Sequence, residues 1–173
     1  MNAARRGRPT FGPLVQGPRN GPLFAVVAVG SFAAVAAALV SQHMYRMEPC
    51  PWCVLQRLVF VAIGAFALLG LLWPGVAGRR FAAAVALLLA VSGLAAALWQ
   101  HFVAAASASC NLTLADRIVS GTGLDGLLPD VFAPRASCAD AAVNLLGVPY
   151  AFWAAALFVI CALAMLRALG ERG

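Results

Sequence analysis

VLQRLVFVAIGAFALLGLLW, residues 54–73, is the stretch that decides the fold. Arg57 is its one charged residue, and a helix of this length crosses a hydrocarbon core of about 30 Å. Three other apolar runs have a similar length: residues 23–40, 81–99 and 148–166. The chain of 173 residues is 63% hydrophobic and 10% charged, with a mean hydropathy of +0.90. Such values exclude a soluble domain, a disordered chain and a small secreted disulfide scaffold.

The four runs predict an all-α fold, an integral membrane four-helix bundle. They are too long and too rich in Ala and Leu for barrel strands, and a helix satisfies its own backbone hydrogen bonds in lipid. Small residues recur at close spacing in two of the runs: Ala33, Ala36 and Ala37 in the first, and Ala82, Ala86, Ala90 and Gly93 in the third. Either they let helices pack closely, or they reflect a general alanine bias.

The arginines predict the orientation of the bundle. They lie before the first run, between the second and third, and after the fourth: Arg5, Arg6, Arg8, Arg19, Arg79, Arg80, Arg167 and Arg172. By the positive-inside rule, both termini are cytoplasmic and the two loops at about residues 41–53 and 100–147 face outward. The net charge of +6 therefore comes from arginines that flank the apolar runs. No nucleic-acid partner is expected. No cleaved signal peptide is expected either, because the first run is too long for one.

Three regions follow from this division. Residues 1–21 are expected to form a disordered basic cytoplasmic tail, residues 22–169 the four-helix domain, and residues 170–173 a short cytoplasmic tail. The segment 107–147 is rich in Gly and Pro and is expected to be an irregular loop with at most short helical pieces. Its apolar residues suit either a segment lying on the bilayer surface or a loop packed on the bundle.

Four of the five cysteines fall in the outward segments: Cys50, Cys53, Cys110 and Cys138. In an oxidising compartment such cysteines are expected to form disulfide pairs. No metal site is expected, because Cys110 and Cys138 do not form a second Cys-X-X-Cys knuckle. Cys161 lies inside the fourth run without a partner at its depth, and is expected to be a small buried apolar side chain.

The element Cys50-Pro51-Trp52-Cys53 lies where the second helix must begin. With Pro51 at the first helical position, Cys50 becomes the N-cap and Cys53 lies in the first turn. Both sulfurs then lie at the positive end of a helix dipole, which stabilises thiolates. Arg57 follows four residues after Cys53, on the same helical face. It either snorkels to the interface or serves as a fixed cation that faces a thiolate and a polar ligand.

Residues 48–57, EPCPWCVLQR, resemble the signature of the DsbB family of bacterial disulfide-bond formation proteins. The stretch 128–132, LPDVF, ahead of Cys138, and Leu146-Gly147 with Pro149 also resemble the family. The resemblance covers nearly the whole chain from the first span onward. It implies a thiol:quinone oxidoreductase of the bacterial inner membrane that reoxidises a periplasmic DsbA-like dithiol oxidase. The expected cofactor is a quinone from the membrane pool, either ubiquinone or menaquinone.

The resemblance also implies a role for each site residue. Cys110 exchanges with the partner's cysteine, Cys138 resolves that mixed disulfide, and these two form one disulfide, Cys110–Cys138. The other disulfide, Cys50–Cys53, reoxidises the loop pair on the periplasmic side. Cys53 meets the quinone, and Arg57 stabilises the thiolate and the quinone oxygen.

His101, at the outer end of the third run, is a second candidate for quinone binding, although an interfacial histidine hydrated by water is the commoner case. The sequence departs from the family at Trp52, where an aliphatic residue is expected, and in a short connection between Gly147 and Pro149. Two alternatives remain. One is a reductase related to vitamin K epoxide reductase, in which the Cys-X-X-Cys is expected in the last helix. The other is a membrane assembly protein with structural disulfides.

Overall fold

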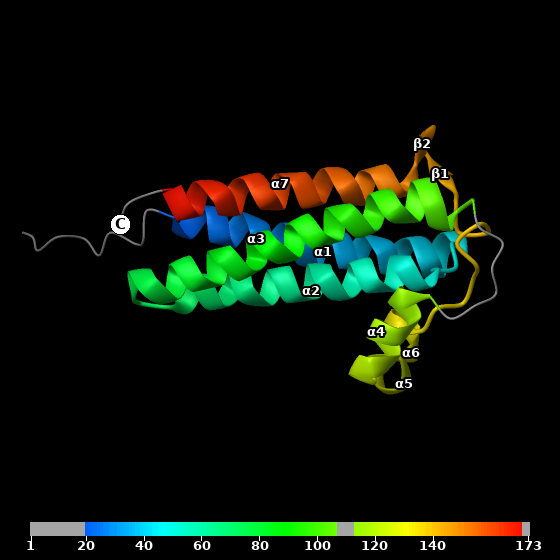
Figure 1. Cartoon of the computed structure of the whole chain (residues 1–173), viewed down its shortest axis with the longest axis horizontal. Coiled ribbons are helices and arrows are strands. Elements are labelled where there is room, and N and C mark those ends of the chain that lie inside the picture. The colour runs from blue at the N-terminus through cyan, green and yellow to red at the C-terminus, as the bar shows by residue number, and fades with distance from the viewer. Residues whose placement is uncertain (1–19, 107–112, 171–173) are drawn as a thin grey trace, which may run out of the picture.

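The computed structural model describes residues 20–106 and 113–170 of the chain. Four long helices dominate it: α1 (Gly21–Tyr45), α2 (Pro51–Leu72), α3 (Val76–Trp99) and α7 (Tyr150–Gly170). Within the described residues, these four helices are long and apolar enough to cross a membrane. The predicted all-α membrane four-helix bundle is thus confirmed (Figure 1).

Each long helix of the bundle packs against two others. α2 lies between α1 and α3, and α7 lies between α3 and α1, which closes the ring. The start of α1, the turn between α2 and α3, and the end of α7 lie at one end of the bundle (Figure 1). We call this the inner end; it carries Arg79, Arg80 and Arg167. The short elements of residues 114–149 gather at the opposite, outer end.

Below the outer end, the bundle has an apolar core. Phe60 of α2 and Phe158 of α7 stack with ring centroids 4.0 Å apart, and the buried alanines of α3 belong to the same core cluster. Ala90 and Gly93 are buried, and a Cβ on Gly93 would overlap the ring of Phe158. Close packing is therefore the correct interpretation of the small residues of α3.

The same interpretation is wrong for the first span. Ala33, Ala36 and Ala37 are exposed on α1, whereas Phe24, Val27, Ala28, Ser31 and Val35 form its buried face. The buried face of α1 carries mostly larger side chains, whereas these three alanines are exposed. For Ala33, Ala36 and Ala37, the general alanine bias of the sequence is therefore the better explanation of the spacing.

The outer segment consists of short pieces, as predicted. A π-helix, η1 (Gln100–Ala104), continues α3. The pieces that follow are α4 (Leu114–Thr122), α5 (Leu124–Leu127), α6 (Pro129–Phe132) and a two-stranded hairpin of β1 (Asn144–Leu145) and β2 (Val148–Pro149). The hairpin was not predicted. It turns through Leu146 and Gly147, both with positive φ, and it delays the last helix to Tyr150 instead of residue 148.

α4 shows how this segment rests on the bundle. A capping box between Thr113 and Asp116 starts the helix. Ala115 and Val119 form its buried face. They join the same cluster as Cys50 and Trp52, at the outer end of α2. Of the two interpretations of this loop, packing onto the bundle is what the structure shows for this face. The predicted disordered tail falls almost entirely at residues 1–19, outside the described part of the chain, as do residues 171–173.

Candidate active site

The first turn of α2 brings two cysteine sulfurs together. Cys50 is the N-cap, with φ −84° and ψ 168°, and its sulfur accepts a hydrogen bond from the backbone N–H of Cys53 at 3.3 Å. The predicted roles of Cys50 as cap and of Pro51 at the start of the helix are confirmed. The two Sγ atoms are 2.9 Å apart, and both residues are free thiols in this structure. The disulfide between them remains a prediction.

Cys138 of the outer segment lies against Cys50. The backbone N–H groups of Arg135 and Ala136 donate to the carbonyl oxygen of Pro49, at 2.9 and 3.2 Å, and so fix the chain just before Cys138. The side chains of Cys138 and Cys50 are hydrogen-bonded to each other. A sulfur of the loop and a sulfur of α2 are therefore within reach for thiol–disulfide exchange.

This contact gives the two cysteines different reactivities. The hydrogen bond from Cys50 holds the pKa of Cys138 below that of an ordinary thiol, against the opposing effect of burial. The pKa of Cys50 is raised, by its hydrogen bonds to Cys138 and Cys53 and by burial. The sequence suggested that both cysteines of α2 favour the thiolate. For Cys50, which is 0% exposed, the raised pKa instead favours the protonated form.

Arg57 lies inside the protein, with 6% of its surface exposed. Its guanidinium donates to the side-chain oxygen of Gln42 at 2.7 Å, to the carbonyl oxygen of Val131 at 3.1 Å and to that of Ala38 at 3.3 Å. Gln42 in turn donates to the carbonyl oxygen of Asp130 at 3.2 Å. Arg57 therefore does not snorkel: it joins α1, α2 and α6 beneath the cysteines.

Two glutamines complete the polar surroundings of Cys53. The side-chain amide of Gln100 donates to the Cys53 sulfur at 3.1 Å, and Gln56 donates to the Gln100 oxygen at 2.6 Å. Both glutamines are buried. The sequence interpretation missed these residues, and Gln42 with them. The available signal was a polar side chain within an otherwise apolar membrane run, which by default indicates a functional site.

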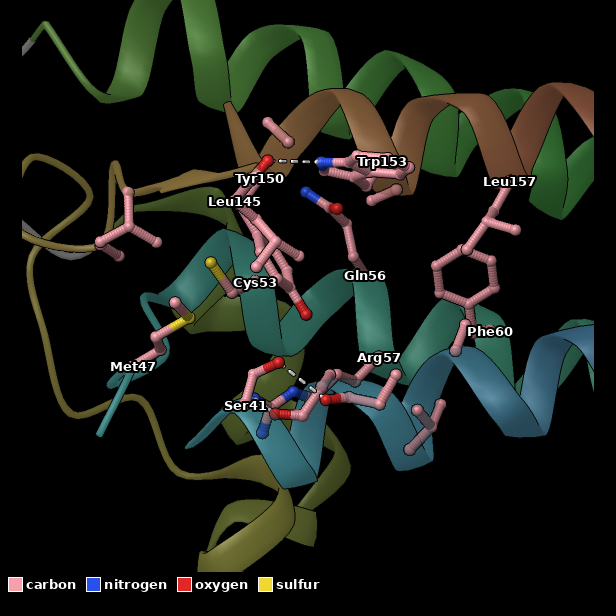
Figure 2. A pocket seen from close by; sticks show the side chains of 18 of the residues that line it. Ser41, Met47, Cys53, Gln56, Arg57, Phe60, Leu145, Tyr150, Trp153 and Leu157 are labelled. Atoms are coloured by element: carbon pink, nitrogen blue, oxygen red, sulfur yellow. Dashed lines mark hydrogen bonds between the residues drawn. The ribbon is translucent and has the colours of Figure 1, made fainter. Parts of the chain in front are cut away.

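A cavity of about 270 Å³ opens beside Cys53, between α1, α2 and α7. Cys53, Gln56 and Arg57 face it from α2, and Tyr150 and Trp153 face it from α7 (Figure 2). Most of the remaining lining is apolar, from Ala34 to Leu157. The hairpin contributes Leu145 to the lining, and the indole N–H of Trp153 donates to the carbonyl oxygen of Leu145 at 3.2 Å.

The other predicted site residues lie elsewhere. His101 stacks against Phe152, with ring centroids 4.6 Å apart, and is not among the residues that line the cavity, so its role as a quinone ligand remains a prediction without support from the geometry. Cys161 is buried on α7, with its sulfur 3.9 Å from the hydroxyl of Ser31. Cys110 lies outside the described residues, and its disulfide with Cys138 remains a prediction. Among the described residues, no cluster of three or more His, Cys, Asp or Glu could hold a metal ion.

Fold and site together define a class: a four-helix membrane protein with a cysteine pair at the mouth of its second helix and a third cysteine docked on it from a loop. Comparison with known proteins identifies the family. The family described as "Disulfide bond formation protein DsbB" matches residues 20–168, and the chain belongs to it.

Several relatives carry the name "Disulfide bond formation protein B". The one from Cupriavidus metallidurans is 31% identical over 150 residues, which are 86% of this chain and 92% of the relative. The one from Ralstonia nicotianae is 33% identical over 157 residues, or 86% and 93% of the two chains. The one from Aromatoleum aromaticum is 35% identical over 154 residues, or 84% and 92%. The resemblance that the sequence suggested is confirmed.

Proposed function

We propose that this protein is a thiol:quinone oxidoreductase that generates disulfides and reoxidises a periplasmic dithiol oxidase of the DsbA type. One observation carries the proposal. Cys50 contacts the loop sulfur of Cys138 on one side, while its neighbour Cys53 lines an apolar cavity on the other. Three sulfurs thus form a path from the loop, which a soluble protein reaches, to a space that a lipid-soluble molecule reaches.

The cavity suits the head group of a quinone. Small-molecule sites are mostly apolar, with a few placed polar groups, and this one combines alanines and aromatic rings with Arg57, Gln56 and Tyr150. Arg57 and Cys53 would hold the quinone head, which supplies a two-electron acceptor when bound. The guanidinium is a fixed cation in a site shielded from water, so it favours negative charge on the sulfur and on an adjoining oxygen.

The cysteines carry the electrons by exchange reactions. The thiolate of Cys138 attacks the Cys50 sulfur of a Cys50–Cys53 disulfide, so that a Cys138–Cys50 bond forms and Cys53 leaves as a thiolate. Cys110 is expected to receive the partner's electrons in the preceding exchange. Each cycle removes two electrons and two protons from the partner's dithiol.

The direction of insertion follows from the charges. Arg79, Arg80 and Arg167 lie at the inner end of the bundle, and the cysteines lie at the outer end (Figure 1). The positive-inside rule then supports a bacterial inner-membrane protein with cytoplasmic termini and periplasmic cysteines. The position of the pair at the start of α2, and not in the last helix, disfavours the alternative related to vitamin K epoxide reductase.

The test separates the two ends of the path. The purified protein is mixed with a reduced DsbA-type oxidase and either ubiquinone or menaquinone, and the loss of quinone absorbance is followed. Cys53→Ser is expected to abolish quinone reduction by both the protein partner and dithiothreitol. Cys138→Ser is expected to abolish reduction by the protein partner while dithiothreitol still reduces the Cys50–Cys53 pair.

Cys161→Ser, which changes a cysteine away from the path, is the control and is expected to keep both reactions. The relay is wrong if Cys138→Ser oxidises the protein partner as fast as the parent. A protein that reduces no quinone with either reductant is instead an assembly protein with structural disulfides.

A further inference from the structure

The two buried glutamines beside Cys53 form a directed chain of hydrogen bonds. Gln56 on α2 donates to the Oε1 atom of Gln100 at 2.6 Å. Because this bond uses the side-chain oxygen of Gln100, the amide N–H groups of Gln100 can donate to other atoms. One of them donates to the Cys53 sulfur at 3.1 Å. Gln56 and Gln100 are 5% and 6% exposed, so water does not replace these bonds.

The backbone at Gln100 is unusual at the same point. α3 changes from α-helix to the π-helix η1 at this residue, and the N–H of Ala105 donates to the carbonyl oxygen of Gln100 at 2.9 Å, five residues back. A π turn adds a residue to the helix, so it turns the side chains that follow relative to those before it. Such turns are rare and occur frequently at functional sites. Here the turn begins at the residue whose side chain meets the sulfur, and His101 next to it turns toward Phe152.

We propose that Gln100 is a catalytic residue of the thiol:quinone reaction, which stabilises the thiolate of Cys53 by an amide hydrogen bond, and that Gln56 is the positioning residue that orients it. A thiolate only accepts hydrogen bonds, and the Gln56 bond ensures that Gln100 presents its nitrogen and not its oxygen. A hydrogen bond to an ionised group is about twice as strong as one between neutral groups. The chain therefore favours the charged form of the sulfur that faces the cavity.

Gln100 and Arg57 act on Cys53 in different ways. The guanidinium of Arg57 donates its hydrogen bonds to Gln42 and to backbone carbonyl oxygens, and it affects the sulfur by its charge at a distance. The side-chain amide of Gln100 donates to the sulfur directly, and the Cys50 thiol, with its sulfur 2.9 Å from that of Cys53, is a second group in hydrogen-bond contact with it. A purely structural role, in which the glutamines only hold α2 against α3, would stabilise the bundle without changing the reactivity of Cys53.

The test measures Cys53 alone, without quinone or protein partner. In the full chain carrying Cys50→Ala, Cys110→Ala and Cys138→Ala, iodoacetamide labelling of Cys53 is followed by mass spectrometry at neutral and at strongly alkaline pH. Gln100→Leu is expected to slow labelling about tenfold at neutral pH, where the thiolate is a minor species, and to leave the alkaline rate unchanged. Gln56→Leu keeps Gln100 but frees its amide to rotate, and is expected to slow labelling about threefold at neutral pH. Ser92→Ala on the exposed face of α3 is the control and is expected to change neither rate.

The inference rests on the proposed function for its role in turnover, but this labelling experiment does not depend on it. Equal neutral labelling in the parent and in Gln100→Leu would overturn the inference and leave the thiol:quinone activity untouched. A rate lowered equally at both pH values would also overturn it, because it would report access to the sulfur and not ionisation. If Gln100→Leu does not fold, Gln56→Leu decides by the same two rates.

Discussion

The two ends of α2 differ more than any other two regions of the bundle. From its third turn toward the inner end, the helix packs Phe60, Ile63 and Ala67 into a core of alanines and phenylalanines. At the outer end, the first two turns of the same helix carry Cys53, Gln56 and Arg57 into a polar network. One helix therefore supplies both packing for the apolar core and the groups of the proposed site.

The difference lies in what the buried polar groups contact. Among the described residues, the buried polar side chains are Ser31, Gln42, Gln56, Arg57 and Gln100. All except Ser31 belong to hydrogen-bond networks at the outer end, and each bond crosses from one element to another. Burial of a charged or polar group within a membrane is expensive, so the concentration of such groups at the outer end supports the proposal that the site lies there.

Removing the charge of Arg57 should have the largest effect on this contrast. Arg57→Ala is expected to raise the apparent KM for quinone roughly hundredfold, because a fixed donor in a site shielded from water is lost. Arg57→Lys keeps the charge without the planar fork and should retain part of the affinity. Quinone-dependent turnover of the purified variants measures both. An unchanged KM in Arg57→Ala would reduce Arg57 to a structural link between α1, α2 and α6.

The apolar core of the bundle should respond to changes of volume and not of charge. Gly93→Ala places a Cβ against the ring of Phe158, which is stacked on Phe60, and is expected to lower the free energy of unfolding by about 1–3 kcal/mol. Thermal unfolding in detergent measures this. Gly30→Ala on α1 is the matched control, because its Cβ would meet no atom within 4 Å, and it should not be destabilising. Equal stability of the two variants would show that the packing of α3 on α7 is not tight.

The contact between Cys50 and Cys138 joins the loop to the outer end, and it makes a prediction about pH. Cys50→Ala removes the hydrogen bond that lowers the pKa of Cys138, so this pKa should rise and its thiolate fraction at neutral pH should fall. Labelling of Cys138 by iodoacetamide at neutral pH is expected to slow about fivefold. A pKa of Cys138 that does not change in Cys50→Ala would mean that the loop sulfur is activated by other groups.

The sequence predicted the bundle well because its signal was local. Four apolar runs fixed the number of helices, and Pro51 fixed the start of α2 with Cys50 as its cap. The ends of the helices were predicted less accurately. The apolar run predicted a helix over residues 23–40, whereas α1 continues to Tyr45 through residues that include polar side chains. The hairpin before α7 was missed because a two-residue strand has too little pattern to predict.

The site was predicted in part for the same reason. Cys53 and Arg57 are one turn apart on one helix, and their spacing places both beside the cavity. Gln42, Gln100 and the carbonyl oxygen of Val131 come from three other segments, so no short motif connects them to α2. His101 was chosen over its neighbour Gln100 on the basis of residue type. The π turn that begins at Gln100 was not predicted, because no sequence pattern used for the prediction indicates such a turn.

The smallest effect is expected from the cysteine that stays out of the path. Cys161 is buried on α7 with its sulfur 3.9 Å from the hydroxyl of Ser31, and both residues lie on the buried faces of their helices. Cys161→Ala removes a small side chain and a weak contact, so turnover should stay within about threefold of the parent while the melting temperature falls by a few degrees. Turnover per folded molecule and thermal unfolding measure the two effects separately. A folded Cys161→Ala protein without activity would extend the chemistry into the apolar part of the bundle and remove the distinction between the two ends of α2.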